Sequence, residues 1–293
     1  MGITSKNEQR SVEAILYQSR LSKEIQMIGF NYLGKLGQLG NQMFQYASAL
    51  GVAEGIRTSC CIPKHDDVMV DALGNRLRVE LFDAFKINPK NVGFIPAQDL
   101  HERKYEFDES FLKLNPERDT NLVGFFQTEK YFTHIEDKIR EEFTFQDHIV
   151  NECEDIIELF EEPIALHIRR GDYLRNSMNH HNLSLEYYEK ALSHFPRDQQ
   201  VVIFSDDTEW CMEQLLFIDN RFIVSEGNGS YHDLYLMTKC SDFIISNSTY
   251  SWWGAWLANT GTVIVPNVWF GPNNAHKSLK DLYPSHWNVI PYS

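Results

Sequence analysis

The stretch from Pro163 to Tyr173, PIALHIRRGDY, decides the fold prediction. It opens with a short apolar run, Pro163–Ile168, and continues into two arginines, a glycine and an aspartate. A continuous apolar run of this length predicts a strand that is buried on both faces, as strands are in parallel sheets covered by helices. Four similar runs follow it along the chain: Val201–Ser205, Arg221–Ser225, Asp242–Ser246 and Thr262–Pro266.

Segments with a helical pattern fill several of the gaps between these strands: Leu185–Phe195, Thr208–Phe217, Asp233–Lys239 and Tyr250–Ala258. Strands that alternate with helices indicate an α/β fold built on a parallel sheet. We therefore predict an α/β domain over residues 151–293.

The beginning of the chain predicts a second unit of the same class. Ile25–Tyr32 reads as a strand, a turn rich in glycine follows, Asn41–Glu54 reads as a helix, and Thr58–Ile62 reads as another strand. We expect Asn41 to be the N-cap of this helix, because its side chain can accept a hydrogen bond from an exposed backbone N–H. The strand, turn, helix and strand together predict the opening of another parallel α/β domain.

The length of 293 residues allows one large domain or two ordinary ones. We assign residues 24–150 to the N-terminal domain and set residues 1–23 apart as an N-terminal extension. Residues 63–135 mix acidic and aromatic side chains with short apolar pieces, and they predict no topology.

The bulk composition excludes several classes of partner. A net charge of −14 argues against a general nucleic-acid binder, whose affinity comes from basic side chains on phosphates, and against binding to an anionic membrane. A small anionic ligand stays compatible with this charge where basic groups cluster locally. The five cysteines form an odd set without a C-x-x-C spacing, which favours neither a disulfide framework nor a zinc site. No apolar run is long enough for a signal peptide or a spanning helix, so we expect a cytoplasmic protein.

Polar signatures come directly after each of the five strands predicted in the second half: HIRRGDY, SDD, SEGNGS, SNSTYS and PN. Ligands of open α/β sheets bind beyond the carboxyl ends of the strands. Polarity of unrelated loops is the alternative, but its recurrence at five strand ends favours a shared pocket.

Two neighbouring arginines at the end of the first of these strands predict an anion site. The alternation of side chains along a strand points His167 and Arg169 to one face and Arg170 to the other. We predict that Arg169 binds a diphosphate, because guanidinium forks onto phosphate oxygens, with His167 beside it. Arg170 is expected to pair with an internal carboxylate such as Asp172. A surface cluster of ion pairs is the alternative.

The second strand ends in Asp206 and Asp207, and each has two interpretations. A carboxylate here can accept hydrogen bonds from a guanine or a ribose, or it can cap the helix that begins near Thr208. We favour a ligand contact for Asp206 and leave both roles open for Asp207. Paired aspartates can also hold a metal ion, but no further ligand of matching spacing is present.

Hydroxyls and amides cluster where another helix begins. Such a helix start presents free N–H groups and partial positive charge, which suits a phosphate. Helix capping is the alternative, but capping needs only one such residue. We therefore predict that the segment binds the anion through five residues: Asn247, Ser248, Thr249, Tyr250 and Ser251. The spacing of Trp252 and Trp256 places them together on one helix, and we assign them to the core.

Four segments together resemble the α-1,2-fucosyltransferases of glycosyltransferase family 11. That family is marked by a GLGNQMFQ-like turn, an H-x-R-R-G-D-Y segment, a later S-D segment and an N-S-T-[FY]-S-W-W segment. Here they stand, in the same order, at residues 37–47, 167–173, 205–207 and 247–253. The resemblance extends over about residues 27–270. One departure is Gln38, which occupies a position where the family usually has a glycine.

The resemblance implies a GT-B architecture, in which two Rossmann-like domains face each other across a cleft. It also implies GDP-fucose as the donor, inversion at the anomeric carbon, transfer to the 2-hydroxyl of a terminal galactoside, and no required cofactor or metal. Such an enzyme fits the assembly of a surface glycan.

The resemblance also implies roles for individual residues. Arg169 would hold the β-phosphate, His167 and Asp206 would lie around the nucleoside, and Ser248–Ser251 would lie around the phosphates. Gly40 and Asn41 would face the ligand from the other domain. A carboxylate should take the acceptor proton, and Asp172 is the nearest candidate for this base.

Two other functions stay open from the sequence. One is an enzyme with another donor or acceptor, such as a protein O-fucosyltransferase. The other is an inactive protein that binds a GDP-sugar or a glycan.

Overall fold

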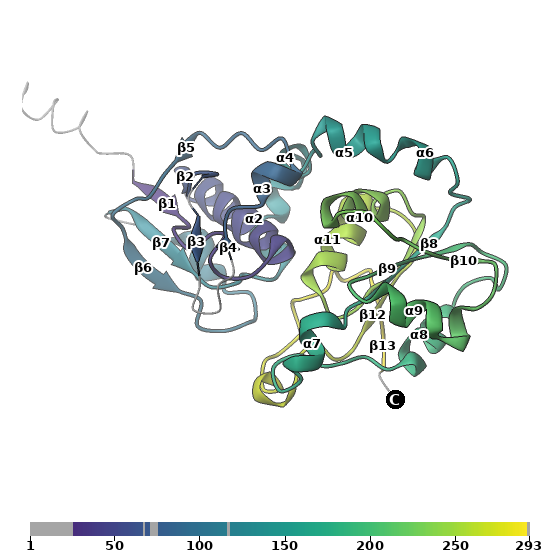
Figure 1. Ribbon diagram of the computed structural model, residues 1–293. Coiled ribbons are helices and arrows are strands. Elements are labelled where there is room, and N and C mark those ends of the chain that lie inside the picture. The colour runs from purple at the N-terminus through teal and green to yellow at the C-terminus, as the bar shows by residue number, and fades with distance from the viewer. Residues whose placement is uncertain (1–25, 67, 71–75, 116–117, 292–293) are drawn as a thin grey trace, which may run out of the picture.

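The structure is a computed structural model that describes residues 26–66, 68–70, 76–115 and 118–291. The predicted extension, residues 1–23, lies outside the described residues. Two sheets dominate the described part of the chain, one on the left and one on the right of Figure 1, and the α-helices lie around and between them. All strand pairs within these two sheets are parallel, as the sequence predicted.

The first sheet has the strand order β5-β2-β1-β7-β6. Its strands are β1 (Met27–Gly29), β2 (Ser59–Ile62), β5 (Asn91–Val92), β6 (Gln98–His101) and β7 (Thr120–Val123). The long helix α2 (Leu39–Gly55) follows β1 and covers the sheet, and it is buried along most of its length. The glycine turn between β1 and α2 contains two residues with positive φ, Gly34 at 80° and Gly37 at 96°, a conformation that favours glycine.

The second sheet has the order β10-β9-β8-β11-β12-β13. Its strands are β8 (Ile164–Ile168), β9 (Val201–Ser205), β10 (Phe222–Val224), β11 (Asp242–Ile244), β12 (Val263–Pro266) and β13 (Asn288–Ile290). Every residue of β8 is buried, which is why this strand reads as a continuous apolar run. The chain runs from β8 outward to β10 and then returns to β11 on the other side of β8. The strand order therefore reverses between β8 and β11, which is where sheets of this kind bind ligands.

Helices connect and cover the second sheet. They are α7 (Gly171–Arg175), α8 (Leu185–Leu192), α9 (Thr208–Glu213), α10 (Ser230–Met237) and α11 (Thr249–Ala258). Shorter elements complete the first half and the link between the sheets: the strands β3 (Met69–Val70) and β4 (Arg76–Leu77), and the helices α3 (Leu81–Ala84), α4 (Glu136–Glu142), α5 (Asp147–Glu152) and α6 (Glu154–Ile157). Single turns of 3₁₀-helix occur at Glu109–Lys113, Glu129–Tyr131, Thr133–Ile135, Leu215–Phe217 and Pro272–Asn274. The predicted boundary after residue 150 falls within α5.

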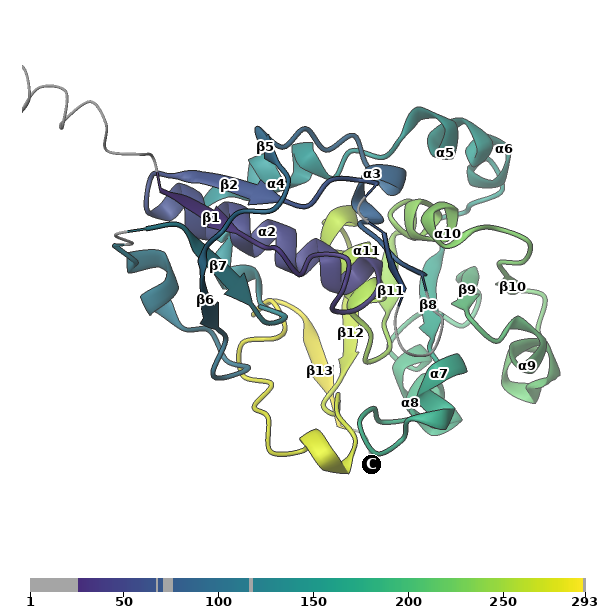
Figure 2. The same ribbon diagram turned by 60° about the vertical axis from the view of Figure 1, so that its left-hand side comes forward.

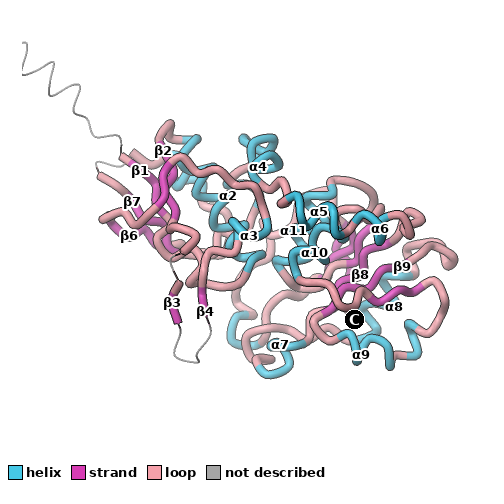
Figure 3. The backbone as a smooth tube through the Cα atoms, turned by 45° about the horizontal axis from the view of Figure 1, so that its top comes forward, coloured by secondary structure: helices cyan, strands magenta, loops and turns pink. Residues whose placement is uncertain are grey.

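Helices α2 and α11 pack against each other between the two sheets, and Figure 3 shows helices filling the space between the two groups of strands. The ring of Phe44 on α2 lies 4.5 Å from that of Trp252 and 4.9 Å from that of Trp253, centroid to centroid. Trp252 and Trp256 are buried and stack at 6.2 Å, so their assignment to the core is confirmed. This aromatic core belongs to both halves of the molecule, because one buried cluster contains residues of both sheets.

The helices approach most closely where both begin. A Cβ atom on Gly40 would lie 2.6 Å from the backbone nitrogen of Tyr250 and 2.7 Å from the carbonyl carbon of Thr249. The indole nitrogen of Trp253 donates a hydrogen bond to the carbonyl oxygen of Gly40 at 3.1 Å. Only glycine fits at residue 40 without moving these two helices apart. Figure 2 shows α2 and α11 side by side.

The start of α2 corrects one prediction. The helix begins at Leu39, so its N-cap is Gln38 and not Asn41. Asn41 lies inside the first turn, where its side chain accepts hydrogen bonds instead of capping the helix.

All five cysteines are free thiols, in keeping with the prediction that no disulfide framework exists. None of the helices formed by the described residues has the length and apolar character that crossing a bilayer requires.

Candidate active site

The guanidinium of Arg169 is fixed just beyond β8 by groups from three segments. Nη2 donates to Oδ1 of Asp172 at 2.7 Å, and Nη1 lies 3.1 Å from Oδ2 of Asp206, which follows β9. Nη2 also donates to Oε1 of Gln38 at 3.3 Å, which comes from the turn after β1 in the first sheet. The Arg169 side chain keeps 19% of its surface exposed. The structure thus holds an oriented guanidinium fork at the junction of the two halves, which is the geometry that phosphate recognition needs.

Arg170 pairs with an internal carboxylate, as predicted, but this carboxylate is Asp207 and not Asp172. Its Nε donates to Oδ2 of Asp207 at 2.9 Å, and its guanidinium stacks 3.7 Å above the ring of Trp210. Asp172, which the sequence suggested as a partner of Arg170, instead pairs with Arg169. Asp172 serves Arg169, because residues 169 and 172 are one helical turn apart at the start of α7, and Asp207 serves Arg170. The Arg170 side chain therefore lies against the start of α9, where Asp207 and Trp210 contact it.

The two aspartates beyond β9 have separate positions. Asp207 is the N-cap of α9, where its carboxylate accepts from the backbone N–H of Trp210 at 3.3 Å. Asp206 does not cap this helix. Its Oδ1 accepts from the backbone N–H of Arg170 at 2.9 Å, and its Oδ2 faces Arg169. Asp206 therefore lies in the site with Arg169, and its contact with a nucleoside stays a prediction.

His167 is buried on β8 next to these groups. The hydroxyl oxygens of Ser246 and Ser251 each lie 2.8 Å from its Nδ1, and only 4% of the residue is exposed. Burial, and secondarily the positive charge of Arg169, lower the pKa of His167 to about 3. The imidazole is consequently neutral at physiological pH. It can offer a hydrogen bond to a ligand but no charge.

The segment that begins α11 is more internally bonded than the sequence suggested. Ser248 is the N-cap, and its hydroxyl accepts from the backbone N–H of Tyr250 at 3.3 Å. The buried Asn247 amide donates to the carbonyl oxygens of His181 and Trp269, both at 2.8 Å. Since these side chains serve the protein itself, the segment offers an anion chiefly the N–H groups of the first turn of α11.

The remaining side chains of this segment link the site to its surroundings. The Thr249 hydroxyl donates to Oδ1 of Asn41 at 3.1 Å, and the Tyr250 hydroxyl donates to the carbonyl oxygen of Ser230 at 2.5 Å. Ser251 is fully buried against His167. The residues predicted at the ends of β8, β9 and β11 thus come together, because these three strands are neighbours in the sheet.

The first half reaches the same place through the start of α2. Gly40 allows the close approach to α11, and Asn41 accepts from the amide of Gln127 at 2.7 Å as well as from Thr249. The Gln127 carbonyl in turn accepts from the hydroxyl of Tyr105 at 2.5 Å. For Gly40 and Asn41 these contacts show a role in joining the two halves at the site.

Sequence reasoning missed several residues at this junction. Both carboxylate oxygens of Glu102, just after β6, accept backbone N–H groups, from Phe125 at 2.8 Å and Phe126 at 3.0 Å. Burial raises the pKa of this carboxyl. Tyr105 meets Phe270 of the second half edge to face, with ring centroids 4.9 Å apart. The strand before them, QDLH, has no apolar run, so no sequence pattern marks its end.

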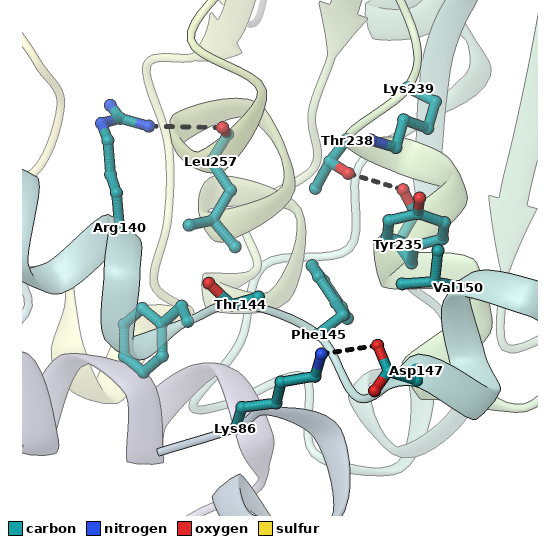
Figure 4. A pocket seen from close by; sticks show the side chains of 11 residues that line it. Lys86, Arg140, Thr144, Phe145, Asp147, Val150, Tyr235, Thr238, Lys239 and Leu257 are labelled. Atoms are coloured by element: carbon teal, nitrogen blue, oxygen red, sulfur yellow. Dashed lines mark hydrogen bonds and ion pairs between the residues drawn. The ribbon is translucent and has the colours of Figure 1, made fainter. Parts of the chain in front are cut away.

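A cavity of about 400 Å³ lies elsewhere, where the link between the sheets meets α10 and α11 (Figure 4). None of the predicted site residues lines it. Its cations have structural partners: Arg140 donates to the carbonyl oxygens of Trp256 and Leu257 at the end of α11, and Lys86 pairs with Asp147. Basic side chains at a helix C-terminus stabilise the negative end of the helix dipole. We therefore do not assign this cavity to the active site.

Within the ranges that the structure describes, no group of three or more histidine, cysteine, aspartate or glutamate side chains is arranged to hold a metal ion. Asp206 and Asp207, the pair considered for a metal, point to different arginines. Among the described residues, positive charge near the site comes from Arg169, from the start of α11, and from Lys277, whose ammonium lies over the rings of Tyr105 and Phe270.

Comparisons with known proteins identify the family of the chain. A family model described as glycosyl transferase family 11 matches residues 4–291, so the match begins inside the segment that the sequence analysis set apart as an extension. The O-antigen biosynthesis glycosyltransferase WbnK of Escherichia coli is 29% identical, over 84% of this chain and 96% of that protein. An alpha-1,2-colitosyltransferase of Escherichia coli is 32% identical, over 80% of this chain and 90% of its own length. The galactoside alpha-(1,2)-fucosyltransferase 1 of Alouatta caraya is 27% identical, over 79% of this chain and 66% of that protein.

Solved structures show the same fold at low sequence identity. The NodZ alpha-1,6-fucosyltransferase soaked with GDP-fucose superposes with a TM-score of 0.53 at 13% identity, covering 84% of this chain and 96% of that one. POFUT1 in complex with GDP gives 0.52 at 11% identity, covering 93% and 99%. These neighbours confirm the predicted α/β fold of GT-B type. With the family match over nearly the whole sequence, they lead to one conclusion: the chain belongs to glycosyltransferase family 11 and is a glycosyltransferase.

Proposed function

We propose that this enzyme transfers fucose from GDP-fucose to the 2-hydroxyl of a galactoside, with inversion and without a metal ion. The observation that carries the proposal is the Arg169 guanidinium, held between Asp172 and Asp206 beside the start of α11. The family and the names of its similar members support the donor and the α-1,2 linkage. The galactoside acceptor and the absence of a metal are parts of the proposal.

The reaction is a single displacement, in which the acceptor hydroxyl attacks the anomeric carbon of the sugar while GDP leaves. Negative charge grows on the diphosphate as the bond breaks, and preorganised donors aimed at that charge lower the barrier. Arg169 supplies a fixed bidentate cation for this purpose, and the first-turn N–H groups of α11 supply partial positive charge. We propose that the neutral His167 and the carboxylate of Asp206 hydrogen-bond the nucleoside.

The acceptor hydroxyl must lose its proton, and Asp172 is our candidate for the base. Its side chain is 50% exposed, so it is open to a substrate while one oxygen holds Arg169. In this role Asp172 orients the arginine and takes the proton in the same active site.

A transfer assay tests the proposed function directly. The purified protein is incubated with GDP-fucose, EDTA and a panel of galactosides, and the products are measured by mass spectrometry. We expect a mass gain of one deoxyhexose on a galactoside, and we expect this gain to persist in EDTA. Loss of product in EDTA, restored by a divalent cation, would contradict the metal-free part of the proposal.

The variant Arg169→Lys is the matched test of the diphosphate contact. Lysine keeps the charge but not the fork, and removal of one such donor typically lowers kcat by about 10²–10³-fold. We expect a loss of this size, and near-normal turnover would refute the assignment of Arg169.

A parallel assay with an activated colitose donor covers the second candidate, which the 32% identity to an alpha-1,2-colitosyltransferase favours. Transfer of colitose in preference to fucose would replace the donor in the proposal. If no donor is consumed in any reaction, a wider donor panel is tested next, and an inactive protein that binds a GDP-sugar or a glycan becomes the leading alternative.

A further inference from the structure

Gln38 occupies an unusual place for a residue at the start of a helix. It is the N-cap of α2, with an extended backbone (φ −85°, ψ −175°), yet its side chain makes no capping hydrogen bond. The side chain is exposed and points away from its own helix toward the second half, where its Oε1 accepts from Nη2 of Arg169 at 3.3 Å. It thus connects the turn after β1 with the arginine beyond β8.

The position of Arg169 fixes where the sugar of a donor must lie. In the proposed function the nucleoside and the diphosphate are held by residues of the second half: His167, Asp206 and the start of α11. The sugar is joined to the β-phosphate through one oxygen atom. A β-phosphate on the Arg169 guanidinium therefore leaves the sugar within a few bond lengths of that guanidinium. Gln38 is the first-half side chain that contacts the guanidinium.

We propose that Gln38 binds the sugar of the donor and makes recognition of that sugar, as distinct from its nucleotide, depend on this side chain. A primary amide carries both an acceptor oxygen and two N–H donors, so it can hydrogen-bond two neighbouring hydroxyls of a 6-deoxyhexose. Once a phosphate occupies the guanidinium of Arg169, Oε1 is released to the sugar. The inference rests on the proposed function, because it takes GDP-fucose as the donor.

The identity of the residue makes this contact a property of this chain. Where the family usually has a glycine, no side chain would reach across to Arg169 or to the sugar. The N-terminal turn itself does not require glutamine, since its backbone at residue 38 is extended and any residue adopts it. The Gln38 side chain is exposed, is hydrogen-bonded to Arg169 and is not needed by its own helix. We therefore assign it to recognition of the donor sugar.

Two binding measurements separate a sugar contact from a mere support of Arg169. GDP has the nucleoside and both phosphates but no fucose, whereas GDP-fucose carries the fucose as well. Isothermal titration with each ligand, in the absence of acceptor, is carried out on the full chain and on Gln38→Ala. If Gln38 contacts the sugar, only GDP-fucose should lose affinity.

We expect Gln38→Ala to raise the Kd of GDP-fucose about 5- to 30-fold, which corresponds to the loss of one or two hydrogen bonds. The Kd of GDP should stay within about twofold of that of the unaltered chain. Gln98→Ala is the matched control, because it removes another glutamine that accepts from an arginine, Arg118 at 3.0 Å, at the opposite end of the first sheet. The control should bind both ligands as the unaltered chain does.

Each other result has a definite meaning. A parallel loss of GDP and GDP-fucose affinity in Gln38→Ala would show that Gln38 acts only through Arg169. Equal affinities in all variants would show that Gln38 does not contact the sugar. Either result overturns the inference and leaves the proposed function intact. Failure of the unaltered chain to bind GDP-fucose would overturn the proposed function and the inference with it.

Discussion

The substitution Gly40→Ala tests whether the close approach of α2 and α11 holds the active site together. The new Cβ would lie 2.6 Å from the nitrogen of Tyr250 and 2.7 Å from both the carbonyl carbon and Oγ1 of Thr249. Heavy atoms in contact normally stay about 3.5–4.0 Å apart, so the two helix starts would have to separate by about 1 Å. Two of the three obstructing atoms are backbone, and they cannot rotate away.

The cost follows from three terms. Forced overpacking costs about 1–3 kcal/mol, and weakening of the hydrogen bond from Trp253 to the Gly40 carbonyl costs about 1 kcal/mol more. Alanine favours a helix over glycine by at most about 1 kcal/mol, which partly offsets the loss. We expect the free energy of unfolding to fall by about 2 kcal/mol, equivalent to a drop in Tm of about 4 °C in a chain of this size.

Two other glycines of α2 provide matched controls in the same helix. A Cβ on Gly55 would meet Leu112 at an ordinary 3.5 Å, so Gly55→Ala should be neutral or slightly stabilising. A Cβ on Gly51 would lie 2.0 Å from the carbonyl oxygen of Tyr131, so Gly51→Ala should also destabilise, but away from the starts of α2 and α11. Thermal unfolding and GDP binding are measured on all three. We expect Gly40→Ala to lose more GDP affinity than Gly51→Ala, and equal stability of Gly40→Ala and Gly55→Ala would refute the reasoning.

Two further predictions concern charges in the site. Asp172→Asn should lower kcat by about 10²–10⁴-fold, the usual size of a general-base contribution. The Kd of GDP should rise less than tenfold, because Asp206 still holds Arg169. A loss of GDP affinity as large as the loss of kcat would mean that Asp172 only positions the arginine. Burial lowers the pKa of His167 to about 3 in the folded chain. Below about pH 6.5 the unfolded chain therefore binds a proton at this residue that the folded chain does not bind, so the free energy of unfolding falls as the pH falls. His167 should account for about 2 kcal/mol of this loss between pH 6.5 and pH 5. In chemical denaturation across that range, His167→Asn should show a correspondingly flatter pH dependence, and parallel curves for the two proteins would contradict the prediction.

The second half of the fold was predictable because, apart from the partly exposed edge strand β10, its predicted strands are largely buried. Such strands leave continuous apolar runs, and the five predicted runs correspond to β8 through β12 in chain order. The helices between them also appear, with ends shifted by a few residues. The last strand, β13, was missed because two of its three residues are exposed and the strand carries no pattern.

In the first half, the predicted opening corresponds to β1, α2 and β2, but the rest of this half resisted prediction. Beyond β2, its strands have two to four residues each, and β6 carries mostly polar, exposed side chains. Such strands are specified by their neighbours in the sheet, and a local pattern does not reveal them. Glu102 and Tyr105 were missed with them.

At the site, residue types were easier to predict than partners. The sequence pointed to Arg169, Asp206 and the start of α11, and the parallel order of β9, β8 and β11 brings them together. It misassigned the partner of Arg170, because the choice between Asp172 and Asp207 depends on how α7 and α9 leave the sheet. Likewise, the capping role of Asn41 failed because the helix begins two residues earlier.

The aromatic core that α2 and α11 share has a consequence for the molecule as a physical unit. Phe44 would lose Trp252 and Trp253 as packing partners if the first half were produced alone, and both tryptophans would lose Phe44 if the second half were produced alone. A fragment ending between the two sheets would expose this surface to water, and exposed aromatic patches of this kind drive aggregation. The two halves are therefore not interchangeable modules. A chimera that exchanges one half with that of a relative must carry α2 and α11 from the same parent, because these two helices share the aromatic core and the turn before α2 also supplies the Gln38 contact to Arg169.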